Sequence, residues 1–143
     1  MTATTPLEKM RAFIETFPDF DEIGQFDVDY TDKLPNAAGL FPSGMVEISR
    51  RTDLLGNVTA RNQLNFALYT RLEKYEDATG NAEWQAAFQE WVQEQSASGQ
   101  APAFGDEPRT ERITAQNGVL YAADEEGTAL YAIQLSVEYT RKF

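Results

Sequence analysis

The last thirteen residues alternate between apolar and polar side chains. Every second position from 131 to 139 is apolar, namely Tyr131, Ile133, Leu135, Val137 and Tyr139. A period of two is typical of a strand with one buried face. A terminal segment frays unless something holds it, and five buried apolar side chains at roughly 1.5–3 kcal/mol each outweigh that fraying. We therefore expect this strand to lie inside a sheet.

Two more alternating segments predict a hairpin. Residues 45–51 (MVEISRR) and 58–73 (VTARNQLNFALYTRLE) both have strand character, although a helix competes over residues 65–74. The connection TDLLGN is short and contains Asp, Gly and Asn, which are turn residues. A short strand is also predicted where Phe26, Val28 and Tyr30 alternate with aspartates. Turn and helix-breaking residues then predict a loop, namely Pro35, Gly39, Pro42 and Gly44.

The C-terminal third predicts a meander of three strands. ERITAQ (111–116) and VLYAA (119–123) flank the Asn117-Gly118 step, the strongest local hairpin signal in the chain. The acidic turn DEEG (124–127) then leads into the final strand. The prediction is strand, turn, strand, turn, strand.

Two helices are predicted from apolar residues at helical spacing. The first covers about residues 6–17, with Thr5 as N-cap, Pro6 at the first helical position and Glu8 completing a capping box; Pro18 ends it. The second covers residues 82–95, with Asn81 as N-cap. Its apolar stripe predicts a core face rather than a stacking surface and consists of Trp84, Phe88, Trp91 and Val92. The opposite, polar face is assigned Gln85, Gln89, Gln93 and Glu94.

These elements predict an α+β fold. Runs of strands with few helices give a mostly antiparallel sheet, here with the two main helices packed on one face. A chain of 143 residues is long enough for one domain with its own core. We therefore expect a single domain over residues 1–143, with a flexible Pro/Gly-rich loop at residues 96–110.

Composition narrows the chemistry. The chain has no histidine and no cysteine, so Ser-His-Asp and Cys-His mechanisms are excluded, while carboxylate, lysine and oxygen-ligand metal chemistry remain open. In the acidic run from Asp19 to Asp32, Gly24 stands at the sixth position of a possible EF-hand loop, but Ile23 and Tyr30 stand at the fifth and twelfth positions, where calcium ligands are required. We predict no catalytic, cofactor-binding or metal-binding residues and no enzymatic activity.

The net charge of −11 predicts repulsion of nucleic acid and of anionic membranes, although solubility alone also explains it. No apolar run approaches the ~18 residues of a membrane span. The N-terminus has no basic segment followed by an apolar one, so no signal peptide is predicted.

Three places are candidates for contact with a partner. Phe104, with Asp106 nearby, is an isolated aromatic in the 96–110 loop; it is either a staple folded onto the core or an anchor for a partner. The carboxylates at the predicted hairpin tip could contact a partner or simply be solvated, and the arginines around the first hairpin could pair with a neighbouring subunit or form ordinary surface pairs. These residues are Asp124, Glu125, Glu126, Arg50 and Arg61.

Three stretches resemble a known family. GMVEISRRTDLLGNVTARNQLNFALYTR, EWQAAFQEWVQEQSASGQAPAFGD and NGVLYAADEEGTALYAIQLSVEYTRKF resemble small tail proteins of phages and prophages that infect Gram-positive bacteria. These are tail terminator or tail completion proteins of siphophages, also called minor tail or minor capsid proteins. The resemblance covers about residues 40–143.

The resemblance implies an α+β subunit of a virion ring, commonly a hexamer, assembled in the host cytoplasm. The ring would cap the tail tube and join it to the head-completion (connector) protein, while an isolated subunit could remain monomeric. DNA would pass through the ring without being bound, since a negative lumen does not hold phosphates. The family implies no cofactor and no catalytic residue, and it places partner contacts in the loop from Ser96 to Arg109 and the tip from Asp124 to Gly127.

Three alternatives remain open from the sequence. One is another head–tail joining or tube protein of the same assembly. A second is an acidic binding or inhibitor module of the DNA-mimic type, which would need carboxylates spaced like phosphates along one face. A third is a carboxylate enzyme that uses a divalent metal.

Overall fold

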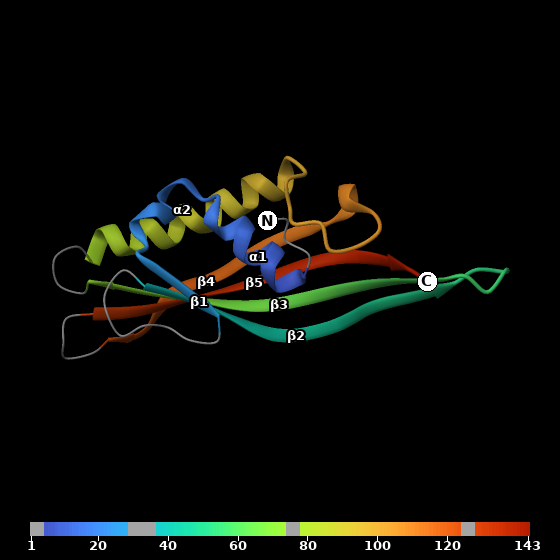
Figure 1. Ribbon diagram of the computed structural model, residues 1–143, viewed down its shortest axis with the longest axis horizontal. Coiled ribbons are helices and arrows are strands. Elements are labelled where there is room, and N and C mark those ends of the chain that lie inside the picture. Colours follow the sequence, from blue (N-terminus) through green and yellow to red (C-terminus); the bar gives the residue numbers. More distant parts are fainter. Residues whose placement is uncertain (1–4, 29–36, 74–77, 124–127) are drawn as a thin grey trace.

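The computed structural model describes residues 5–28, 37–73, 78–123 and 128–143. Its five-stranded sheet has the order β1-β2-β3-β5-β4, and every neighbouring pair is antiparallel except β1 and β2. The helices α1 (Pro6–Glu15) and α2 (Ala78–Ala97) both lie over one face of the sheet (Figure 1). The predicted α+β class with helices on one face is confirmed. The strands are β1 (Gln25–Val28), β2 (Ala37–Thr52), β3 (Val58–Glu73), β4 (Arg112–Ala123) and β5 (Thr128–Lys142).

The final strand lies inside the sheet, as its alternation predicts. β5 pairs with β3 on one side and β4 on the other. Ile133, Leu135 and Val137 are fully buried under the helices, whereas Gln134 on the opposite face is exposed. Pairing on both edges and burial on one face hold the C-terminal segment in place.

Aromatic side chains fill the space between the two helices. Phe17, just after α1, lies with its ring centroid 5.2 Å from those of Phe88 and Trp91 and 5.5 Å from that of Trp84. Phe88 is fully buried and Trp84 nearly so. The apolar stripe of α2 is therefore part of the core, as predicted, and the aromatic contacts fix α1 against α2.

The helix boundaries differ from the prediction. Thr5 does cap α1, because its Oγ1 accepts a hydrogen bond from the Glu8 N–H at 3.2 Å. The assignment of Asn81 as a cap is wrong, since α2 begins at Ala78 and Asn81 lies buried within it. The placement of Gln85 on a polar face is also wrong: Gln85 is buried and its Nε2 donates to Thr70 Oγ1 of β3 at 2.9 Å.

The predicted loop before residue 45 is partly strand. β2 begins at Ala37, and its first four residues are buried between β1 and β3. Pro42 is tolerated because β1 ends opposite Leu40, so no neighbouring strand needs an N–H from the outer edge at that point. Gly44 has a φ of 97° and follows a shift in the β2–β3 register, where glycine accommodates a bulge.

The predicted turn at Asn117-Gly118 is wrong. β4 continues through these residues, and its pairing with β5 shifts register between Gln116 and Val119. Both halves of β4 pair with the single long strand β5. The long partner edge outweighs the local turn preference, so two strands replace the predicted meander of three. The DEEG segment lies outside the described residues, as does Tyr30 of the predicted short strand.

The sheet is longer than the helical layer. In Figure 1 the ends of β2, β3 and β5 extend beyond both helices, and the β2–β3 connection projects farther still. We call residues 45–62, which comprise the distal part of β2, the connection and the start of β3, the arm; its connection, residues 53–57, is the tip. All residues from 42 to 57 are exposed.

A candidate partner-binding surface

The arm carries almost all the large exposed apolar side chains of the described residues. Leu54 and Leu55 at the tip are 105% and 89% exposed, and three side chains of β2, Met45, Val46 and Ile48, are about half exposed. The other such residue in the described part of the chain is Phe143, which lies at the base of the tip with its N–H bonded to Val58 O. Large exposed apolar side chains gathered on one projecting element indicate a candidate interaction surface.

Asp53 organises the tip that displays the two leucines. Its Oδ1 accepts hydrogen bonds from the backbone N–H groups of Leu55 and Asn57, each at 2.9 Å, and its Oδ2 accepts from Asn57 Nδ2 at 3.0 Å. Gly56 has a φ of 86°, a conformation that favours glycine. The hydrogen bonds from Asn57 hold the pKa of Asp53 below its ordinary value. The tip is therefore a defined turn.

Of the two arginines predicted as contacts, Arg50 lies on the arm and Arg61 at its base. Arg50 is exposed and forms an ion pair with Glu47 at 2.9 Å. Arg61 donates from Nη2 to Thr110 O at 2.8 Å and from Nη1 to Thr140 Oγ1 at 3.0 Å, with Glu138 at 3.9 Å. Arg61 thus ties β3 to β5 and to the 3-10 helix η2 (Pro108–Thr110). Contact of either arginine with a partner remains a prediction.

The loop before β4 is fastened to the sheet. The Phe104 ring packs edge-on against Tyr139, with centroids 5.9 Å apart, which is the staple arrangement. The Asp106 N–H donates to Thr140 O at 2.8 Å, and Asp106 Oδ2 accepts from the Lys142 N–H at 2.7 Å. Since β4 begins opposite Glu138, these contacts cover the edge of β5 that β4 leaves open.

The side chain of Glu111 holds the backbone of the same loop, at Phe104 and Gly105. Its Oε1 accepts hydrogen bonds from the backbone N–H groups of Phe104 and Gly105, and the side chain is buried. Oε2 has no hydrogen-bond partner among the described residues. Burial raises the pKa of Glu111, and the two N–H groups together with the nearby charges of Lys9 and Arg61 oppose that rise. Lys9 also donates from Nζ to Ala103 O at 2.7 Å, which joins α1 to the loop.

The predicted acidic contacts Asp124, Glu125 and Glu126 lie outside the described residues. Sequence reasoning assigned Asp53-Leu54-Leu55-Gly56 only as a connection and so missed its leucines. The available signal was a pair of large apolar residues between turn residues, where polar side chains are usual.

Within the described ranges, no three acidic side chains are grouped so that they could hold a metal ion. No helix in those ranges combines the length and apolar character needed to cross a membrane.

Comparison with protein-family models and with curated proteins finds no match to this chain.

Proposed function

We propose that this protein is a structural subunit of a phage tail, a tail terminator that forms a ring on the end of the tail tube and joins it to the head-completion protein. The observation that carries this proposal is the arm, a preorganised hairpin that presents Leu54 and Leu55 to solvent at the end of the sheet. A subunit that must join other proteins needs such a projecting contact, whereas a free monomer gains nothing from it. The resemblance over residues 40–143 selects the tail among the assemblies that could use it.

The charge of the chain suits this role. A net charge of −11 disfavours the binding of phosphates, so DNA can pass such a ring without being held. The loop that Phe104 fastens to Tyr139 and the acidic segment 124–127 remain proposed contact regions for the tail tube and the head-completion protein. The proposed location is the virion, and the proposed role requires no cofactor or catalysis.

The test is to image phage particles assembled without this protein. Loss of a tail terminator should give tail tubes of irregular, excessive length that carry no heads, and expression of the wild-type chain in trans should restore uniform tails. Tails of normal length that fail to join heads would instead identify a head–tail joining protein. Normal, infectious particles would overturn the proposal, because a virion ring at this position cannot be dispensable.

A further inference from the structure

A groove runs along the flank of the molecule between α2 and the start of β4. It has a volume of about 860 Å³, and its floor and sides include the small or apolar residues Ala86, Ala97, Ile113 and Ala115. Ala86, Glu90, Gln93 and Ala97 follow one another on a single face of α2, at the spacing of successive helical turns. β4 is the last strand of the sheet, so the groove lies at a free edge.

We propose that this groove receives the arm tip of a second copy of the chain, with Leu54 and Leu55 as the inserted side chains. The inference rests on the proposed function only in treating the chain as a ring subunit. It names the partner of the arm as another copy and the receiving surface as the α2–β4 groove.

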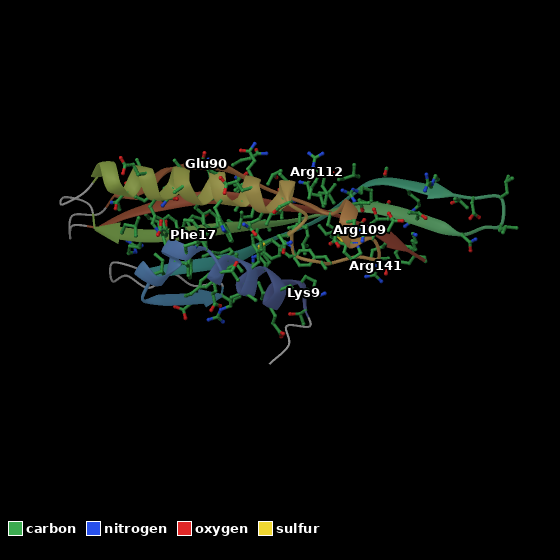
Figure 2. All side chains as sticks on the ribbon, turned by 90° about the horizontal axis from the view of Figure 1, so that it is seen from above. Lys9, Phe17, Glu90, Arg109, Arg112 and Arg141 are labelled. Atoms are coloured by element: carbon green, nitrogen blue, oxygen red, sulfur yellow. The ribbon has the colours of Figure 1, made fainter. Side chains whose placement is uncertain are left out.

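The positions of tip and groove require two molecules. Figure 2 shows Glu90 and Arg112, which line the groove, along the flank opposite α1, whereas the hairpin tip lies beyond the end of the sheet. The tip therefore does not reach the groove of its own molecule. Two different surfaces meet in such a contact, so an open chain of copies keeps a free groove at one end and a free tip at the other until a ring closes.

Charge selects these two surfaces over others. Segment 44–57 contains two arginines and two carboxylates, so the whole net charge of −11 resides elsewhere in the chain. The groove is also neutral, since Glu90 and Arg112 are its only charged lining residues among those described. Two copies of an acidic protein repel each other over most orientations, and a contact between two neutral surfaces avoids this repulsion. Arg51 of the arm, which has no ion-pair partner in the described residues, can then meet Glu90 at the groove.

The absence of cysteine from the chain permits a direct test. Full-length Leu55→Cys protein is mixed with Ala97→Cys protein and oxidised mildly. Ala97 is exposed at the end of α2 and lines the groove. We expect a covalent dimer of the two variants. Ala12→Cys, exposed on α1, is the matched control and should not link to Leu55→Cys.

Sedimentation velocity over a concentration series gives the second measurement. Wild-type protein should associate, and Leu54→Ser/Leu55→Ser should weaken the association on the order of 100-fold or more, since two leucines lose their burial. Ala86→Glu/Ala97→Glu, which changes two exposed groove positions, should have a similar effect. Circular dichroism of each variant verifies that the fold is intact.

Several outcomes would overturn the inference. A wild-type protein that stays monomeric and shows no Leu55–Ala97 crosslink would mean that the arm serves a different protein, such as the tail tube. A Leu55→Cys protein that links only to itself would mean a tip-to-tip contact. Neither of these results contradicts the proposed phage role. Conversely, normal particles assembled without the protein would overturn the phage role but would not contradict an observed tip-to-groove crosslink.

Discussion

The Oε1 atom of Glu111 accepts a hydrogen bond from the backbone N–H of Gly105 at 3.2 Å, and the carboxylate that makes it is buried. A second N–H, that of Phe104, points at the same oxygen. The loop that covers the edge of β5 is thus held by an acidic group whose charged form is disfavoured by burial. This arrangement makes the stability of the folded state depend on pH.

Stability should fall as pH rises through the raised pKa of Glu111. An acid whose pKa is higher in the folded state binds more protons when folded, so folding is favoured at low pH and this contribution is lost as pH rises. The window extends upward from the ordinary value of 4.5 to the raised pKa. The positive charges of Lys9 and Arg61 oppose the rise in the pKa of Glu111. They therefore narrow the pH range over which this stability is lost.

Glu111→Gln is the variant that isolates this effect. It retains an oxygen acceptor for the two N–H groups and removes the titration. Urea denaturation of both proteins at several pH values should show a smaller fall in unfolding free energy across the window for the variant. Parallel pH curves would contradict the assignment. Glu111→Ala should instead cost about 1–3 kcal/mol, because two buried donors lose their acceptor.

Gly105→Ala should detach the loop from β5. A Cβ at this position would lie 2.3 Å from Thr140 O and 3.1 Å from Tyr139 Cδ2, and the carbonyl belongs to the backbone of β5, which is paired with β3 at this point. We expect a loss of about 1–3 kcal/mol, typical of overpacking, in the urea unfolding free energy.

Ala103→Ser is the matched control for Gly105→Ala, since it changes an exposed side chain in the same loop. It should leave the unfolding free energy unchanged. A Gly105→Ala protein as stable as wild type would show that the loop does not lie against Thr140.

Thr70→Val should destabilise the protein by about 1–3 kcal/mol, because Gln85 Nε2 loses its acceptor while buried beside it. The double variant Thr70→Val/Gln85→Leu removes both polar partners and should recover much of the loss. Thermal or urea unfolding of the two single variants and the double variant forms a complete cycle. Additive losses in the double variant would mean that the two side chains do not interact.

Asp53→Ala should loosen the tip without unfolding the protein. The N–H groups of Leu55 and Asn57 lose the carboxylate that accepts from them. Hydrogen exchange should therefore accelerate at these two amides while the amides of β5 stay protected. Ser49→Ala, at an exposed position of the same arm, should leave both amides unchanged. Unaltered exchange in Asp53→Ala would show that the turn forms without its side chain.

The elements predicted correctly are those whose signal comes from residues close together in the sequence. The alternation of β5 identified its buried face, because successive side chains of a strand point to opposite faces whatever its partners are. Thr5 could be assigned as a cap because the groups that it satisfies lie three residues away. The aromatic stripe of α2 was recognised as core for the same reason.

The errors occur where a distant partner decides. Asn117-Gly118 favours a turn by itself, yet β5 offers pairing on both sides of this step, and the strand continues with a shifted register. From the sequence Gln85 is expected on the polar surface of α2, but in the structure it faces Thr70 of β3 and forms a hydrogen bond with it. The sequence predicts a loop at residues 37–40, but in the structure these residues form a strand because β1 and β3 pair with them on both edges.

The sequence by itself determined the class of fold, the buried face of β5 and the lack of histidine and cysteine chemistry. Only the tertiary structure decided that the β2–β3 hairpin extends beyond the helices, so that Leu54 and Leu55 are exposed to solvent. Exposure depends on which other segments cover a residue, and no periodicity along the chain records that. The candidate surface exists because the β2–β3 hairpin is longer than the helical layer that covers the sheet. That difference is set by packing between segments far apart in the sequence.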